Sequence, residues 1–256
     1  MIVKYQKNIL LLLFIAVIAS CSSGAKITYL QNADTKPPEE KALKYEPTLQ
    51  PDDLLSIIVS AQNPESTAPF NLPQIQGNYE IGNNQNGIKT YLINNEGEIE
   101  FPVIGKVKLG GLVRTEANKK LEALVSEYVK NPGINLRILN FKISVLGEVS
   151  RPGTFSIDSE RITLLEALGK AGDLTIYGKR SDLLIIRENN GVKKYQRVDI
   201  TKADFVSSPF YYLAQNDVVV VNPNKTKINS SAVGPNTSTI LTAISILATL
   251  VVLLFK

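Results

Sequence analysis

The sequence predicts an α+β protein, with a β-rich body of short elements followed by one long apolar helix at the C-terminus. The chain's 16 Gly and 13 Pro divide its 256 residues into short segments. Many of these segments alternate Val or Ile with polar residues, as half-buried strands do. Residues 237–255 carry no charge and are rich in Ile, Leu and Val, which indicates a long helix in apolar surroundings.

The composition excludes several classes of protein. The formal net charge is only +4 and the basic residues form no concentrated patch, so we expect no nucleic-acid partner. His is absent and Cys occurs once, which excludes His-based catalytic triads and metal sites built on His or several Cys. We therefore expect a protein that is not an enzyme, with no catalytic residues, no metal ligands and no cofactor.

Residues 1–20 have the pattern of a lipoprotein signal peptide. Two lysines precede an apolar run at 9–19, which would reach only about 17 Å across a bilayer core about 30 Å thick. The run ends in Ile-Ala-Ser-Cys, which matches the bacterial lipobox, so we expect Cys21 to be acylated and to become the new N-terminus. Ser22 follows it in place of Asp, which favours the outer membrane. A small buried cysteine is the alternative interpretation.

Residues 237–256 are predicted to form a C-terminal transmembrane helix, because the apolar stretch would span about 28 Å as an α-helix. At 100° per residue, four hydroxyl side chains fall on one face: Ser238, Thr242, Ser245 and Thr249. Two interpretations stay open. The helix is a single anchor whose hydroxyls bond to their own backbone, or it stands in a ring of copies with the hydroxyls facing neighbours or a water-filled lumen.

Two polar segments bracket the body. Residues 21–45 are predicted to be an extended lipidated tether, and residues 223–236 a linker, because both are rich in polar residues and Pro. Alternating apolar residues between them predict strands at 54–59, 91–93, 98–101, 103–108, 134–139, 142–149, 154–157, 183–187, 193–198 and 217–221.

Capping and turn residues define the helices and hairpins of the body. Thr115 is the predicted N-cap of a helix to residue 130, and Thr163 that of a helix from 164 to 171. Asn94–Gly97 predicts a hairpin turn between the strands at 91–93 and 98–101, and residues 189–191 predict another. Asp52 and Asp53 are interpreted as a turn ahead of a strand, not as paired catalytic carboxylates.

The aromatic run at residues 210–212 has two interpretations. Tyr211 and Tyr212 are candidates for contact with a glycan, because aromatic rings match the apolar faces of sugar rings. A place in the core or at an interface is the alternative.

These motifs carry a family likeness. Leu-Gln-Pro-Asp-Asp-Leu-Leu-Ser-Ile at 49–57 and Gly-Glu-Ile-Glu-Phe-Pro-Val-Ile-Gly at 97–105 resemble the polysaccharide export domain of Wza-type outer-membrane export proteins. This implies an export domain at 46–140. The segment from Ile-Ser-Val-Leu-Gly-Glu-Val at 143–149 to Val-Val-Val at 218–220 resembles the soluble-ligand-binding β-grasp (SLBB) module that follows it, which implies a second domain at 141–222.

The resemblance implies an outer-membrane lipoprotein that forms a ring-shaped homo-oligomer, octameric in the best-known relative, with its body in the periplasm. Such rings export capsular polysaccharide or exopolysaccharide together with an inner-membrane co-polymerase and tyrosine kinase. This chain departs from the pattern in having one β-grasp module instead of two. The alternative is a periplasmic glycan-binding or envelope-bridging lipoprotein that forms no pore.

Overall fold

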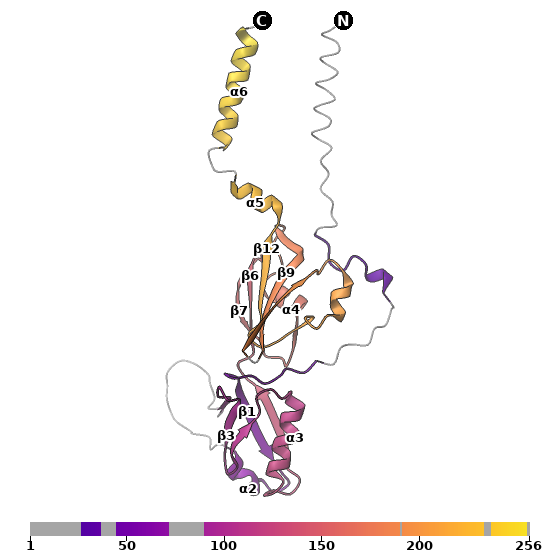
Figure 1. The fold of residues 1–256 in the computed structure, drawn as a ribbon, viewed down its shortest axis with the longest axis vertical. Coiled ribbons are helices and arrows are strands. Elements are labelled where there is room, and N and C mark those ends of the chain that lie inside the picture. Colours follow the sequence, from indigo (N-terminus) through magenta and orange to yellow (C-terminus); the bar gives the residue numbers. More distant parts are fainter. Residues whose placement is uncertain (1–26, 37–44, 72–89, 190, 233–236, 255–256) are drawn as a thin grey trace.

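The computed structural model describes residues 27–36, 45–71, 90–189, 191–232 and 237–254. The predicted signal peptide and the segment at 72–89 therefore lie outside the described residues. The body is built on two hydrophobic cores, one formed by residues between 49 and 136 and the other by residues between 141 and 221 (Figure 1). Its combination of small sheets and short helices confirms the predicted α+β class.

The first core lies between a three-stranded antiparallel sheet of order β2-β1-β5, the hairpin β3-β4 and the helix α3. α3 buries Ala117, Leu121 and Val125, which recur every four residues on one helix face. The elements are β1 Leu54–Ser60, α2 Pro64–Thr67, η3 Ala68–Phe70, β2 Tyr91–Leu92, β3 Glu98–Phe101, β4 Gly105–Lys108, α3 Arg114–Val125 and β5 Gly133–Ile138.

The predicted hairpin between the strands at 91–93 and 98–101 is wrong. The turn itself forms, with the Gly97 amide donating to the Asn94 carbonyl over 2.8 Å and Gly97 at φ 76°. However, β2 pairs with β1 and β3 pairs with β4, so the two strands belong to different sheets. The pairing of Ile99 with Val107 places two buried side chains together against the core.

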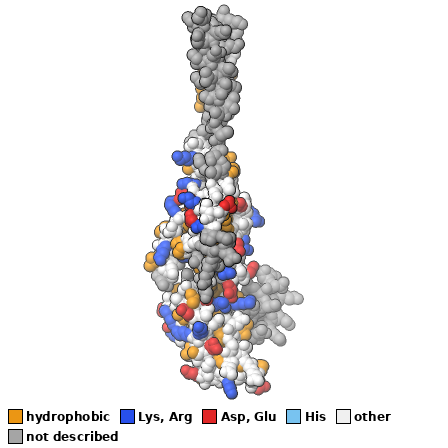
Figure 2. All heavy atoms as spheres, turned by 90° about the vertical axis from the view of Figure 1, so that its right-hand side faces the viewer, with side chains coloured by type: hydrophobic (Ala, Val, Ile, Leu, Met, Phe, Trp, Pro, Cys, Tyr) orange, Lys and Arg blue, Asp and Glu red, His pale blue; other side chains and the backbone are white. Residues whose placement is uncertain are grey.

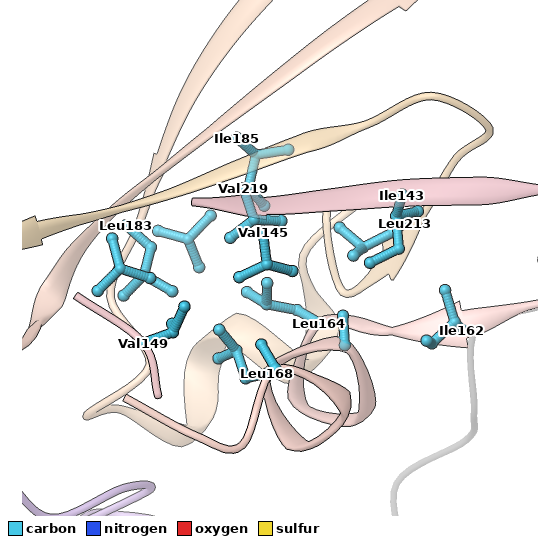
Figure 3. Close-up of a cluster of buried hydrophobic side chains, with 14 of the residues drawn as sticks. Ile143, Val145, Val149, Ile162, Leu164, Leu168, Leu183, Ile185, Leu213 and Val219 are labelled. Carbon is cyan, nitrogen blue, oxygen red and sulfur yellow. The ribbon is translucent and has the colours of Figure 1, made fainter. Parts of the chain in front are cut away.

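The second core lies between α4 and a five-stranded sheet of order β10-β9-β12-β6-β7, in which β12 and β6 run parallel. Side chains from neighbouring strands, such as Val145, Ile185 and Val219, face Leu164 and Leu168 of the helix (Figure 3). The elements are β6 Lys142–Gly147, β7 Gly153–Ser156, β8 Ile162–Thr163, α4 Leu164–Lys170, β9 Gly178–Asn189, β10 Val192–Val198, η4 Ala203–Ser207, β11 Tyr212–Leu213 and β12 Val218–Pro223.

The described part of the predicted tether is docked on the body, which the sequence did not indicate. Residues 27–36 include the short helix η2 (Ala33–Thr35), and Tyr29 and Leu30 pack against the second core. The Gln31 amide donates to the Thr201 carbonyl over 2.8 Å. The prediction of an extended tether is therefore wrong for these residues. Tyr29 and Leu30 bury apolar surface on the second core, although most residues around them in the sequence are polar.

The C-terminal part of the chain contains two helices, α5 (Lys225–Ala232) and α6 (Thr237–Leu254). α5 lies inside the predicted linker and begins where the Asn224 side chain accepts a hydrogen bond from the Lys227 amide over 3.0 Å. α6 confirms the predicted C-terminal helix as secondary structure. Among the residues that the structure describes, no helix has the combination of length and hydropathy that a membrane crossing requires, so the transmembrane role is unsupported.

Candidate functional site

The aromatic run at 210–212 lies in the loop after η4 and at the start of β11. Tyr212 is only 9% exposed, and its ring stacks on that of Tyr45 with centroids 5.0 Å apart. The guanidinium of Arg161 lies 5.2 Å from the Tyr212 centroid, and Tyr211 contacts the ring edge-on at 5.0 Å. Protein groups therefore surround Tyr212, while Tyr211 is half-buried, so Tyr211 is the more accessible of the two predicted glycan contacts.

A buried ion pair holds this region in place. Arg187 donates to both carboxylate oxygens of Asp217, with a shortest distance of 2.6 Å, and to the Tyr212 carbonyl over 2.9 Å. The same guanidinium lies 4.7 Å from the centroid of the Phe210 ring. Burial raises the pKa of the Asp217 carboxyl, and Arg187 opposes that shift. The charge of Arg187 is thus largely compensated within the protein.

A groove of about 580 Å³ opens next to this ion pair, between the β9–β10 hairpin and the loop before β11. None of the described residues that line it is acidic, whereas positive and negative side chains are mixed on the visible face of the body in Figure 2. The sequence alone does not indicate this groove, although Lys194 and Gln196 are spaced as residues on one face of a strand. Its lining residues are Arg187, Asn189, Lys194, Tyr195, Gln196, Pro209 and Phe210.

A smaller cleft of about 280 Å³ lies where the two cores meet. Arg114 and Arg137 come from the first unit, the part of the body built on the first core. Asp158 and Glu160 come from the second unit, in the loop between β7 and β8. Arg114 pairs with Glu160 over 3.4 Å. Positive and negative side chains therefore balance in this cleft, which gives it no preference for a charged ligand.

Two similar turns place a buried aspartate ahead of a strand. The Gln50 amide donates to Asp53 Oδ2, and the Ala214 amide donates to Asp217 Oδ2, each over 2.8 Å. Asp53 lacks a counterpart to Arg187, and its Oδ1 has no hydrogen-bond partner among the described residues. Burial raises the pKa of Asp53 to about 6. The predicted turn at Asp52–Asp53 is confirmed, and the Asp53 carboxylate accepts a hydrogen bond within it.

The predicted lipidation site and hydroxyl stripe are at the two ends of the chain. Cys21 lies outside the described residues. In α6, Ser245 donates to the Thr242 carbonyl and Thr249 donates to the Ser245 carbonyl, each over 2.8 Å. These are the bonds to the helix's own backbone that one of the two interpretations expects. Ser238 lies on the same face by its position in the helix.

The residues that the structure describes contain no cluster of three or more His, Cys, Asp or Glu side chains arranged to hold a metal ion. The geometry instead offers exposed grooves with aromatic, amide and basic groups. These groups bind by contact and hydrogen bonding.

Comparison with known proteins gives the family. Residues 41–139 match the model of the polysaccharide biosynthesis/export protein family, and residues 141–221 match that of the SLBB domain. The chain is 31% identical over 163 residues to the EPS I polysaccharide export outer membrane protein EpsA of Ralstonia nicotianae, and 32% identical over 148 residues to the protein of the same name from Ralstonia solanacearum.

These alignments cover 61% and 56% of this chain, but only 42% and 38% of the two Ralstonia proteins. The chain thus spans less than half the length of the curated relatives that it matches. The two family matches are consecutive and coincide with the two cores of the fold. The chain therefore belongs to the Wza-type family of polysaccharide export proteins.

Proposed function

We propose that this protein exports capsular polysaccharide or exopolysaccharide across the outer membrane, without catalysing a reaction. The observation that carries the proposal is the uninterrupted order of an export region and an SLBB domain, shared with relatives named as polysaccharide export outer membrane proteins. That name also supports a location in the outer membrane. In this proposal the body faces the periplasm, and Tyr211 is the one of the two predicted tyrosines placed to touch the passing glycan.

The exposed surface of α6 supports assembly into a ring of identical subunits. Its large apolar side chains are 51–62% exposed in the single chain, which is unusual for a soluble monomer. We infer that neighbouring copies and outer-membrane lipid cover them in a closed ring, which is octameric in the best-known relative. These side chains are Ile240, Leu241, Ile244, Ile246, Leu247 and Leu250.

The hydroxyl face of α6 fits such a ring. In this proposal Ser238, Thr242, Ser245 and Thr249 face neighbouring subunits or the lumen. The hydrogen bonds of Ser245 and Thr249 to the helix backbone also allow these two hydroxyls to lie in apolar surroundings. The proposed ring therefore does not require a water-filled lumen along the whole length of α6. An inner-membrane co-polymerase and tyrosine kinase is the proposed partner that delivers the glycan.

Removal of residues 237–256 tests the export function. The truncated chain is expected to keep its folded body, because both cores lie before residue 222, but to lose assembly and polysaccharide secretion. Secreted polysaccharide is measured in cells that lack the native gene and carry either chain. Native mass spectrometry in detergent measures the number of subunits. Normal secretion by the truncated chain would contradict the proposal.

The alternatives without a pore give different results in the same system. A full-length chain that is monomeric in detergent would support a periplasmic glycan-binding lipoprotein. An epitope after Lys256 that antibodies reach only in lysed cells would support a protein that bridges the envelope.

Acylation of Cys21 is tested separately. The full-length protein from membranes is expected to start at Cys21 and to carry the mass of attached acyl chains. Two or more chains are needed for a firm hold on one leaflet. Cys21→Ser is expected to remove that mass and to retain the signal peptide, both of which intact-protein mass spectrometry measures. An unmodified Cys21 in the membrane-bound protein would refute this part of the proposal.

A further inference from the structure

The groove beside the β9–β10 hairpin lies on the same face of the sheet as the second core, beyond the last residues that the core covers. Leu183 and Ile185 are fully buried on that side of β9, and their partners on β10 are Val198 and Gln196. Two residues further, where no core covers the strand, Arg187 pairs with Lys194. Because side chains two residues apart share a strand face, the buried apolar face becomes a polar, accessible one.

The charges of the groove are unbalanced. Arg187 is neutralised by Asp217, as described above. Lys194 makes no hydrogen bond or ion pair with any described residue, and none of the described lining residues carries a carboxylate. One ammonium group therefore remains available to a negatively charged ligand, with no acidic side chain to repel that ligand.

The remaining lining matches the surface of a sugar chain. Pro209 and the half-buried Phe210 ring supply an apolar wall, and Asn189 and Gln196 supply amides that donate and accept hydrogen bonds. Sugar rings present apolar faces together with hydroxyl groups that act as donors and acceptors. A volume of about 580 Å³ falls in the range of sites for small ligands, about 300–1,000 Å³.

We propose that this groove binds an anionic stretch of sugar chain, with Lys194 opposite a carboxylate or other acidic substituent and Phe210 against a sugar ring. The polymeric nature of the ligand rests on the proposed export function. The groove takes a charged sugar in preference to a neutral one, because its free ammonium is the one uncompensated charge of the lining.

The chain contains no Trp, so a single introduced indole reports on the groove alone. Tyr195 lines the groove and is 65% exposed, so Tyr195→Trp is expected to leave the fold intact. The full-length variant in detergent is titrated with hexagalacturonate, an acidic hexasaccharide, and with neutral maltohexaose. We expect a saturable change in indole emission with hexagalacturonate, and binding of maltohexaose at least tenfold weaker.

Lys193 provides the matched control for Lys194. It is the preceding residue of β10, is not among the residues that line the groove, and pairs with Glu188 over 3.7 Å. In the Tyr195→Trp background, Lys194→Glu is expected to weaken hexagalacturonate binding about tenfold, and Lys193→Glu less than twofold. A second reporter, Tyr128→Trp in the other unit, is expected to show no change.

Three results would overturn the inference: no saturable signal at millimolar hexagalacturonate, equal binding of the two hexasaccharides, or equal effects of Lys193→Glu and Lys194→Glu. Secretion separates this inference from the proposed function. If Lys194→Glu cells secrete normally and the variant binds hexagalacturonate as the parent does, the groove is refuted and export stands. If the parent binds hexagalacturonate but deletion of the gene leaves secretion unchanged, the groove stands and the export function is refuted.

Discussion

The two buried aspartates, Asp53 and Asp217, occupy equivalent turns but differ in the charged residues around them. Asp217 is fully buried against Arg187, whereas Asp53 is fully buried and no Lys or Arg among the described residues pairs with it. A buried carboxylate without a cation favours its protonated form, which is why the pKa of Asp53 lies at about 6. Ionisation of Asp53 at neutral pH therefore costs folding free energy.

The pH dependence follows from the two pKa values of Asp53, 3.8 in the unfolded chain and about 6 in the folded one. Because the folded value is raised, this residue imposes no penalty below pH 4. The free energy of unfolding then falls between about pH 4 and 6, by roughly 3 kcal/mol in total. We expect Asp53→Asn to remove that slope and to stabilise the protein at pH 7.5 by about 1–3 kcal/mol, measured by denaturant unfolding at several pH values.

Asp52 is the control for this prediction. It is exposed, has φ 69°, and Asn tolerates that conformation. Asp52→Asn is expected to change the free energy of unfolding by less than about 0.5 kcal/mol. An Asp53→Asn protein that is less stable than the parent at pH 7.5 would show that the carboxylate has a partner that stabilises it.

Among the elements, α3 shows how a helix end depends on distant residues. The sequence indicated Thr115 as its N-cap, but the helix starts at Arg114, and the Glu46 carboxylate accepts the Thr115 amide over 3.1 Å. Hydrogen bonding from the Thr115 side chain lowers the pKa of Glu46. A carboxylate at a helix N-terminus also interacts favourably with the helix dipole. The cap thus joins the start of the body to α3.

Removal of this cap is expected to destabilise α3 modestly. Glu46→Ala should lower the free energy of unfolding by at most about 1 kcal/mol, because the carboxylate is exposed to solvent. Glu46→Gln keeps an acceptor oxygen and should lose about half as much. The lowered pKa means that the parent keeps this contribution above about pH 4.5 and loses it as the pH falls. Equal stability of the parent and Glu46→Ala would contradict the capping role.

In the whole molecule, a small set of amide hydrogen bonds joins the two cores. Asn140, in the connection between β5 and β6, accepts from the Leu54 amide over 2.9 Å and donates to the Asp52 carbonyl over 2.8 Å. Gln215 donates to the Asn140 carbonyl and accepts from the Lys142 amide. These bonds hold the β5–β6 connection against the turn at Asp52 in the first unit and the turn at Gln215 in the second. The two units are therefore expected to unfold together.

Asn140→Ala is expected to uncouple the two units. It removes both side-chain bonds to the first unit, which should cost about 1–3 kcal/mol and make residues 139–141 accessible to protease. Scanning calorimetry should then resolve two transitions in place of one. Asn135→Ala is the control, because Asn135 is exposed on β5 and its side chain makes no hydrogen bond between the two units among the described residues. A single unshifted transition in Asn140→Ala would show that other contacts couple the units.

The sequence by itself determined the order of the two modules, most strands, the N-cap of α4 at Thr163, and the presence of a C-terminal helix. These features depend on local periodicity and on residues within a few positions of one another, which a sequence shows directly. The tertiary structure alone decided the sheet to which β2 belongs, the docking of residues 27–36, the cap from Glu46 and the groove beside Lys194. Each of these depends on contacts between residues distant in the chain, such as the 69 positions between Glu46 and Thr115, and such contacts leave no local pattern.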